Sequence, residues 1–259
     1  MDKQKLYDEM AARKSAPKDF NTYIGDNGRV NRCAELIKQG KLKTGGILLD
    51  VGGAIGDLGY AVQNLYDRTV IVDISSQNLE AARSKGNWTM LSDCDVDGFN
   101  NTILPPEGAY DEPLEDGSVS MLTALDFIEH IIDPENFARE CYRVLKPGGQ
   151  VFINTPNIRF WRHIEQLWRQ GRFPHTSGDR EVYFGGHLAN FTFLDLCEIF
   201  GNAGFTCSLP IKDEEGYEQP PEEYLNPVLS NGPQNQTQYL EACVELGCPN
   251  LLFKCVKSS

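Results

Sequence analysis

The residues best suited to bind a ligand lie together in one stretch, ILLDVGGAIG, between Ile47 and Gly56. An apolar run containing an acid leads into a turn with few side chains, which is typical of a buried strand that ends in a tight turn before a helix. Glycines permit positive φ and lack the Cβ atom that would hold a ligand away, and a helix start offers unpaired N–H groups. The stretch therefore predicts a nucleotide-binding turn, and the turn alone fits more than one kind of nucleotide.

The spacing of the glycines separates these ligands. A dinucleotide fingerprint needs G-x-G-x-x-G, which no register of GGAIGDLG supplies, and a P-loop needs Gly-Lys-Ser/Thr, which is missing. A second acid, Asp73, ends the next apolar run, TVIVD. An acid at the end of the second strand is placed to accept hydrogen bonds from both hydroxyls of a ribose. We expect Asp73 to bind a ribose and to have no packing role.

In these features the sequence resembles the class I S-adenosylmethionine-dependent methyltransferases. The resemblance implies that the glycine turn holds the methionine end of the cofactor and that Asp73 binds its ribose. It continues in PLEDGSVSMLTALDFIEHIIDPENFARECYRVLKPGGQVFINTPN, which is similar to the fourth strand, the following helix and the fifth strand of the family. GGHLANFTFLDLCEIFGNAGF is similar to the segment that precedes the sixth strand in the small-molecule branch, so the resemblance covers roughly residues 45 to 209.

Two residues depart from the pattern of the family. Ala54 stands where the second glycine is usual, and its methyl group is tolerable there if φ is negative. Ser120 stands where DGS(F/V) is usually followed by Asp, which we expect to affect strand packing alone.

The resemblance also implies the cofactor contacts. The acid after the third strand receives the adenine amino group in this family, which assigns that role to Asp93 together with the backbone of Cys94. The alternative for Asp93 is an acid that only forms a turn. The full set of expected cofactor contacts is Asp50, Gly52, Gly53, Ala54, Gly56, Asp73, Ile74, Asp93, Cys94, Leu125 and Asp126.

Composition excludes several classes of function. The 259 residues carry a net charge of −13, so the chain lacks the basic excess of nucleic-acid-binding proteins. The eight cysteines form no C-x-x-C pair and no zinc-like spacing with the four histidines, so we expect no metal and reduced thiols. The amino terminus is too charged for a signal sequence, and no apolar run approaches the ~18 residues of a membrane span. We expect a cytoplasmic protein that binds neither nucleic acid nor membrane.

The resemblance implies a Rossmann-like, doubly wound α/β fold with a seven-stranded sheet, mostly parallel with an antiparallel last strand, and helices on both faces. Helix and strand signals along the chain place these elements. The expected strands are 47–51, 69–73, 88–91, 119–123, 150–156, 205–209 and 251–256. The expected helices are 31–42, 57–66, 76–83, 134–146 and 193–203, with starts at Ser75 or Ser76, Asp133 and Thr192, and a stop at Pro147-Gly148-Gly149.

We expect a single methyltransferase domain over residues 1–259. Its parts are an N-terminal helical segment or lid (1–44), a cofactor-binding core (45–157), a lid-like insertion (158–190), and a C-terminal part of the core (191–259) with a further acidic insertion (210–250). The stretch 95–113 should be an irregular acidic loop.

The insertion from 158 to 187 is rich in aromatic and basic residues and should leave the sheet at its carboxyl edge, where open α/β sheets bind ligands. We expect it to cover the substrate, with substrate contacts from Trp161, His163 and Tyr183. Tyr23 of the N-terminal segment is a further expected contact, which could lie over the cofactor as a lid. These residues could instead be lid packing or, for Tyr23, part of a surface loop. Exposed aromatics also mark subunit interfaces, so a homodimer is the rival explanation of the insertion.

Methyl transfer from a sulfonium depends mainly on positioning, which is worth up to ~7–11 kcal/mol in well-oriented systems. A hydroxyl or amine acceptor also has to lose a proton, for which histidine is suited near neutral pH. His187 in GGHLANFT and His130 in FIEHI are the catalytic candidates. For His130, the alternative is a structural Glu-His pair that is common in the family.

The fourth strand ends in LTALDF and lacks the Asn/Asp-Pro-Pro-aromatic tetrapeptide of enzymes that methylate amino groups in nucleic acids and glutamine side chains. Together with the acidity of the chain, this favours O- or N-methylation of a small metabolite, sugar or biosynthetic intermediate. The alternatives are a cofactor-binding but non-catalytic partner or regulatory subunit, and a protein methyltransferase. The missing dinucleotide fingerprint disfavours a nicotinamide oxidoreductase.

Overall fold

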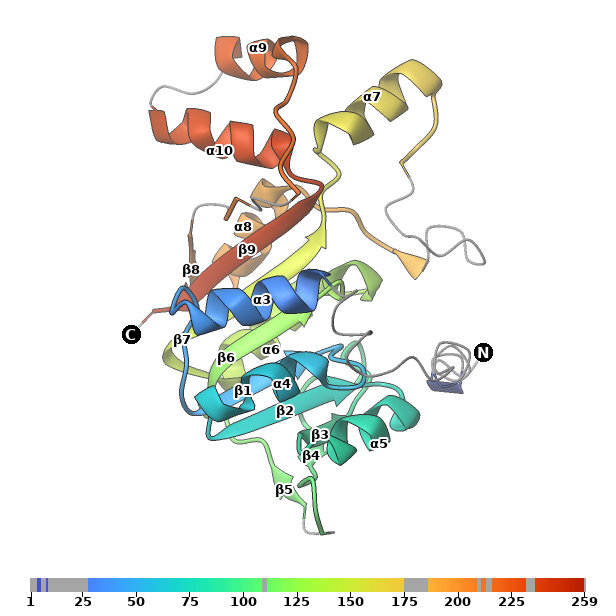
Figure 1. Ribbon diagram of the computed structural model, residues 1–259, viewed down its shortest axis with the longest axis vertical. Helices are drawn as coiled ribbons and strands as arrows, with labels where there is room; N and C mark the ends of the chain where they lie inside the picture. Colours follow the sequence, from blue (N-terminus) through green and yellow to red (C-terminus); the bar gives the residue numbers. More distant parts are fainter. Residues whose placement is uncertain are drawn as a thin grey trace.

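In the computed structural model of the chain, a seven-stranded sheet forms the centre of the molecule, with strand order β3-β2-β1-β6-β7-β9-β8 (Figure 1). The structure describes residues 4, 5, 8, 28–108, 111–174, 186–208, 211–212, 216–231 and 236–258. The strands are β1 (Ile47–Val51), β2 (Arg68–Asp73), β3 (Trp88–Leu91), β6 (Val119–Leu125), β7 (Leu145–Pro156), β8 (Phe205–Cys207) and β9 (Asn250–Lys257). Neighbouring strands from β3 to β7 are parallel, and β9 runs antiparallel to both β7 and β8. The predicted sheet is confirmed.

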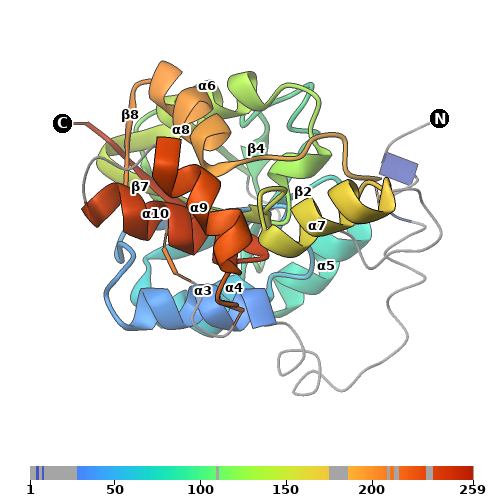
Figure 2. The same cartoon turned by 90° about the horizontal axis from the view of Figure 1, so that it is seen from above.

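Helices cover both faces of this sheet, as predicted. Figures 1 and 2 show α3 (Gly28–Lys38), α4 (Asp57–Val62) and α5 (Ser76–Ser84) on one face, with α6 (Pro134–Val144) and α8 (Phe193–Asn202) on the other. Successive side chains of a strand point to opposite faces. Leu48 of β1 accordingly packs in the cluster under α3, whereas Leu49 packs in the cluster under α6 and α8.

Three helices begin where their polar caps predict. The Ser75 hydroxyl accepts a hydrogen bond from the backbone N–H of Asn78, and Asp133 caps α6 in the same way. Thr192 and Asp195 form a reciprocal capping box at the start of α8. Such caps satisfy backbone donors that the first helical turn leaves unpaired, so local sequence is enough to place these helix starts.

The predicted end of α6 is wrong. The helix ends at Val144, and Leu145 already belongs to β7, where it pairs with Val119 of β6. The Pro147-Gly148-Gly149 turn therefore lies within the strand that it was expected to precede. Pairing with β6 extends the backbone before the sequence itself breaks the helix.

Three other segments differ from the structure that the sequence predicts. The loop 95–113 contains a small antiparallel pair, β4 (Thr102–Ile103) with β5 (Glu112–Pro113), anchored by the buried side chain of Ile103. The helix expected over 57–66 divides into α4 and a 3-10 turn, Gln63–Leu65. The acidic insertion contains α9 (Glu222–Asn231) and α10 (Gln236–Gly247).

One end of the molecule is formed by α9, α10 and α7 (Trp161–Gln170), which lie above the sheet in Figure 1 and in front of it in Figure 2. Ile164 of α7 packs against a small core made by Leu225, Cys243 and Leu246 of the other two helices. This satellite core holds the first insertion against the second one. In the part of the chain that the structure describes, no helix has the length and apolarity of a membrane span.

Candidate active site

The acids and glycines singled out in the sequence meet at the carboxyl edge of the parallel strands. The backbone N–H of Gly52, just after β1, donates to the Val72 carbonyl at 2.8 Å, next to Asp73 at the end of β2. On the other side of β1, the N–H of Asp126 after β6 donates to the Asn154 carbonyl of β7 at 2.8 Å. Parallel pairing thus aligns strand ends that lie far apart in the sequence.

The glycines of the turn are required by the protein itself. Gly52 and Gly56 have φ values of 67° and 74°, in the left-handed region that favours glycine. A Cβ atom on Gly53 would lie 2.5 Å from a carboxylate oxygen of Asp50, and one on Gly56 would lie 2.6 Å from the side-chain nitrogen of Asn87. The turn is therefore closed by side chains that pack directly on the glycine Cα atoms.

The methyl group of Ala54 causes no strain only where φ is negative, and this condition is not met. Its φ is +45°, because the turn needs the left-handed conformation at this position as well. A left-handed L-residue costs roughly 1–2 kcal/mol. The backbone N–H of Ala54 donates to Oδ2 of Asp73 at 3.1 Å, and this charge-assisted bond helps to hold the strained residue in place.

Asp73 has a structural role, so the expectation that it lacks one is wrong. Its Oδ1 accepts hydrogen bonds from the Ser75 N–H at 2.8 Å and the Asn78 side chain at 3.3 Å, while Oδ2 accepts from Ala54. Asp73 thereby ties the glycine turn to the start of α5. A carboxylate has about four acceptor positions, of which these bonds use three, and ribose binding stays a prediction.

Asp50 is almost completely buried at the end of β1 and accepts a hydrogen bond from the Thr123 hydroxyl of β6 at 2.7 Å. Burial raises the pKa of Asp50 to about 7, with a smaller contribution from the negative charge of Asp73. The Thr123 hydrogen bond acts in the opposite direction. Thr123 carries no signal in the sequence, because only strand pairing places it beside Asp50.

The remaining expected cofactor contacts lie at the same edge. Asp93 follows β3, and its Oδ1 accepts a hydrogen bond from the Asp95 N–H at 3.2 Å, as a turn-forming acid does. Ile74, Cys94 and Leu125 are half-buried, and adenine binding by Asp93 and Cys94 stays a prediction. Asp126 has a positive φ of 50° and forms an ion pair with Arg29, a residue that sequence reasoning did not identify.

Two of the four expected substrate contacts, Tyr23 and Tyr183, lie outside the described residues. The other two belong to α7, where Trp161 stacks against Tyr224 at 5.9 Å and His163 Nδ1 donates to the Asn157 carbonyl at 2.8 Å. These contacts are internal packing. Leu167 and Trp168 on the same helix are exposed, so the lid and the subunit contact both stay predictions.

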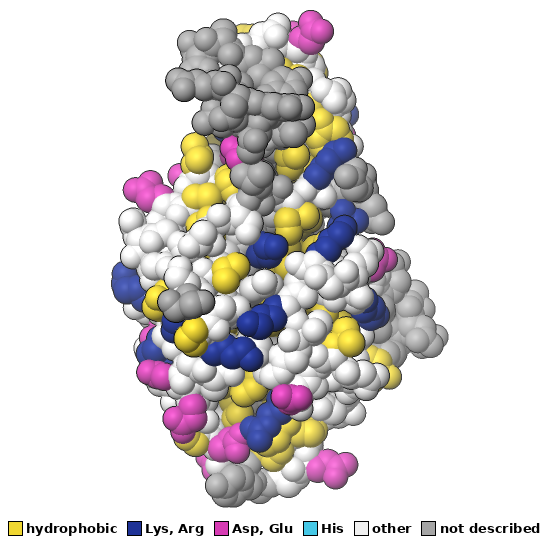
Figure 3. Space-filling view, turned by 90° about the vertical axis from the view of Figure 1, so that its left-hand side faces the viewer, with side chains coloured by type: hydrophobic (Ala, Val, Ile, Leu, Met, Phe, Trp, Pro, Cys, Tyr) yellow, Lys and Arg dark blue, Asp and Glu magenta, His cyan; other side chains and the backbone are white. Residues whose placement is uncertain are grey.

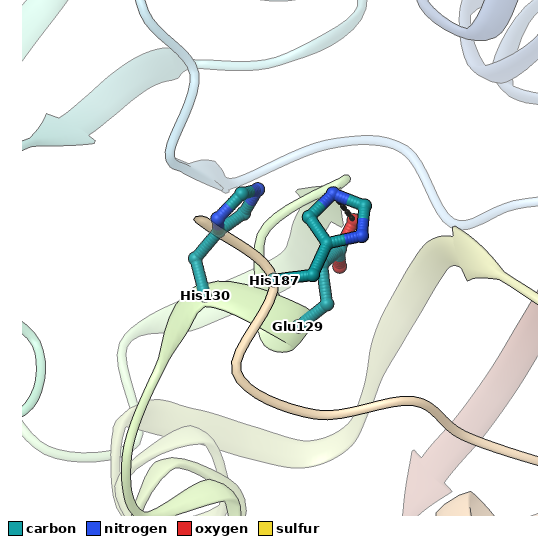
Figure 4. A group of neighbouring side chains, drawn as sticks. All are labelled: Glu129, His130 and His187. Carbon is teal, nitrogen blue, oxygen red and sulfur yellow. Dashed lines mark ion pairs between the residues drawn. The ribbon is translucent and has the colours of Figure 1, made fainter. Parts of the chain in front are cut away.

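The two catalytic candidates are brought together. His130 ends the 3-10 turn Ile128–His130 after β6, and His187 precedes α8, yet their ring centroids are 4.7 Å apart. Figure 4 shows the two rings side by side, with the carboxylate of Glu129 next to His187. His187 Nε2 lies 4.0 Å from Oε1 of Glu129. Figure 3 views the molecule from the left-hand side of Figure 1. Acidic and basic side chains are visible on this face, and no described histidine is visible there.

Glu129 completes this cluster, although sequence reasoning treated it only as part of a structural Glu-His pair. Its side chain is 1% exposed, and Oε2 accepts a hydrogen bond from the Thr155 hydroxyl of β7 at 2.8 Å. Burial raises the pKa of Glu129 to about 7 and lowers the pKa of His187 to about 4, with the neighbouring His130 adding to the latter. The cluster therefore consists of a buried carboxylate and two half-buried imidazoles at the edge of the sheet.

Comparison with known proteins agrees with this architecture. Residues 27–208 match the family model described as "Methyltransferase domain". The ubiquinone biosynthesis O-methyltransferase of Xanthomonas oryzae pv. oryzae (strain PXO99A) is 31% identical over 114 residues, which are 44% of this chain and 44% of that relative. The match to this relative thus covers less than half of its length.

Solved structures show the same fold at low sequence identity. One is from the complex between the Haloferax volcanii Trm112 methyltransferase activator and a protein assigned as a methyltransferase, with a TM-score of 0.59, 16% identity, and coverage of 99% of this chain and 97% of that one. Another is Haemonchus contortus phosphoethanolamine N-methyltransferase 2 in complex with phosphomonomethylethanolamine and S-adenosylhomocysteine, with a TM-score of 0.52, 18% identity, and coverage of 88% of this chain and 53% of that one.

Proposed function

The chain belongs to the methyltransferase-domain family, and from this premise we propose that it transfers the methyl group of S-adenosylmethionine to a small-molecule acceptor. The observation that carries the proposal is the direct bond between the glycine turn and Asp73. It joins a turn suited to the methionine end of the cofactor to an acid suited to its ribose, on adjacent parallel strands.

We propose a hydroxyl oxygen as the acceptor atom. Relatives that match 44% of the chain are named ubiquinone biosynthesis O-methyltransferases, and the net charge of −13 disfavours a polyanionic acceptor. A hydroxyl has to lose its proton during methyl transfer. Glu129, His130 and His187 form a polar cluster where β6 and β7 end, and we propose that this cluster promotes the loss of the proton.

Calorimetric titration with S-adenosylmethionine and with NAD tests the cofactor. We expect saturable binding of the sulfonium cofactor and none of NAD. Asp73→Ala should weaken cofactor binding at least tenfold, because a charge-assisted hydrogen bond contributes about 1.5–3 kcal/mol. Asp67→Ala, at an exposed acid outside the site, is the control. An unchanged dissociation constant in Asp73→Ala would show that this acid does not bind the cofactor.

Asp73 also holds the turn and α5, so each variant should be titrated well below its thermal midpoint. Turnover is then tested by mass spectrometry on hydroxyl, amine and protein acceptors. Transfer to a small hydroxyl compound supports the proposed acceptor class. Transfer to protein alone would favour a protein methyltransferase, and tight cofactor binding without any transfer would favour a non-catalytic partner subunit.

A further inference from the structure

We propose that Glu129, His130 and His187 form a binding site for a divalent transition-metal ion, of the class of Zn²⁺ or Mn²⁺. In this proposal, an oxygen atom of the acceptor binds the ion at an open coordination position. The ion-binding part stands on the geometry of the three side chains, whereas the role of the acceptor oxygen rests on the function proposed above.

The three residues offer one donor atom each, and these atoms all lie within 4.8 Å of one another. Donors around a tetrahedral ion with bonds of 2.0–2.2 Å are about 3.4 Å apart. Small rotations about side-chain bonds are enough to close the difference. All three side chains rise from two neighbouring backbone segments and point to the same side (Figure 4).

Glu129 supplies an independent observation that points to a cation. The side chain is 1% exposed, and its Oε1 has no hydrogen-bond partner, whereas Oε2 is held by Thr155. A buried carboxylate oxygen without a partner is costly, and a bound cation would satisfy it. The unsatisfied oxygen is also the one that faces His187.

The neighbouring backbone prepares the ligands. His130 Nδ1 lies 3.2 Å from the Gly186 carbonyl, which can only accept, so Nδ1 carries the proton and Nε2 is the unprotonated ring nitrogen, as in a histidine that binds a metal ion. The N–H groups of Leu188 and Ala189 both donate to the Glu129 carbonyl, at 2.7 Å and 3.2 Å. These bonds fix the segment that carries His187 against the turn that carries the other two ligands.

The donor types select the ion. Imidazole favours zinc and other first-row transition metals, whereas Mg²⁺ and Ca²⁺ prefer oxygen donors alone. Two histidines and one carboxylate leave at least one coordination position open, which is the arrangement of catalytic zinc sites rather than of structural ones. An exchangeable ligand can therefore bind there.

An acceptor hydroxyl in the open position would become more acidic, as water does on zinc. Its proton then passes to solvent water, and a lone pair of the oxygen forms the new bond to the methyl carbon. The electron pair of the broken C–S bond returns to the sulfur, which leaves as a neutral thioether. Charge and atoms balance without a further reactant.

Titration of the chelator-dialysed full chain with Zn²⁺, Mn²⁺ and Mg²⁺ tests the site. We expect saturable binding of one Zn²⁺ or Mn²⁺ per chain and weaker binding of Mg²⁺. Glu129→Gln, His130→Asn and His187→Asn should each lower the affinity at least about tenfold. His163→Asn and Glu135→Gln, which change a histidine and a glutamate outside the cluster, should not lower it. Circular dichroism should verify that each variant is folded.

Equal ion affinity of the wild type and the three cluster variants would overturn the site, as would the absence of saturable binding. For the acceptor oxygen, the paramagnetic resonance spectrum of bound Mn²⁺ should change when a hydroxyl acceptor is added. An unchanged spectrum together with active transfer would overturn that role and leave the ion site. Failure of S-adenosylmethionine to bind would overturn the proposed function while ion binding persisted.

Discussion

The glycine turn after β1 and the Glu129–His130–His187 cluster occupy the same edge of the sheet but are built in opposite ways. The backbone of the turn is bonded to Asp73 of β2 and to Asn87, just before β3, while Asp50 accepts from Thr123 of β6 and Phe127 packs on Gly52. The cluster joins the 3-10 turn after β6 to the segment before α8, is held by Thr155 of β7, and keeps a buried oxygen of Glu129 without a hydrogen bond.

This difference separates two ways of preparing a binding site. In the turn, the cost is backbone strain at Ala54, whose φ is +45°, whereas Gly52 and Gly56 adopt positive φ without strain. Neighbouring side chains hold the strained shape before any ligand arrives. In the cluster, the cost is an unsatisfied buried acid, which a ligand can relieve. The turn should therefore be rigid without ligand, and the cluster should gain stability when an ion binds.

The largest expected effect is on the pH dependence of stability in the turn. Burial raises the pKa of Asp50 from its ordinary value of 3.8 to about 7, so the folded protein holds this proton more tightly than the unfolded chain. The resulting stability is fully present below pH 3.8 and is lost as the pH rises to about 7. The upper limit of the loss is roughly 4 kcal/mol, from about 1.4 kcal/mol per pKa unit.

Asp50→Asn should remove this pH dependence, because the amide does not ionise and can still accept from Thr123. Urea unfolding of both proteins between pH 4.5 and 8, without cofactor, gives the difference. Other acids titrate equally in the two proteins and cancel. Parallel curves for wild type and variant would mean that Asp50 has an ordinary pKa.

A smaller effect is expected from the shape of the turn. Gly56→Ala should lower the free energy of unfolding by about 2–4 kcal/mol, because left-handed strain adds to the clash of the new methyl group with Asn87 and Ala82. Gly45→Ala is the matched control, since Gly45 has a φ of +78° and nothing within 4 Å of its Cβ position. Strain alone should cost about 1–2 kcal/mol there. An equal decrease in the free energy of unfolding of the two variants would show that the turn rearranges to accommodate the methyl group at position 56.

The smallest expected effect is on stability at the Glu129–His130–His187 cluster. Thr155→Val keeps the shape of a fully buried side chain but removes its hydrogen bond to Glu129. We expect a loss of about 1–2 kcal/mol in the free energy of unfolding, measured by urea, and no change in S-adenosylmethionine affinity. Thr155→Ser, which keeps the hydroxyl, is the control. A weakened cofactor affinity in the valine variant would show that cluster and turn are coupled.

The sequence by itself determined the layered fold, most of the sheet and the starts of its helices. Alternating and helical apolar patterns are local, and so are the caps at Ser75, Asp133 and Thr192. It also placed the glycine turn and Asp73, since the glycine spacing and the acid that ends an apolar run are local patterns. It misplaced the end of α6, because pairing of Leu145 with Val119 is a contact between strands that no local pattern encodes.

Only the tertiary structure decided the partners within the site. Thr123 beside Asp50, Arg29 beside Asp126 and Thr155 beside Glu129 join residues that strand pairing and helix packing bring together. The same holds for His130 and His187. The sequence singles out each histidine separately and does not show that Glu129 lies with them. Their spacing along the chain matches no metal-binding pattern, since the distance that matters is measured across the sheet edge and depends on how β6, β7 and the segment before α8 pack.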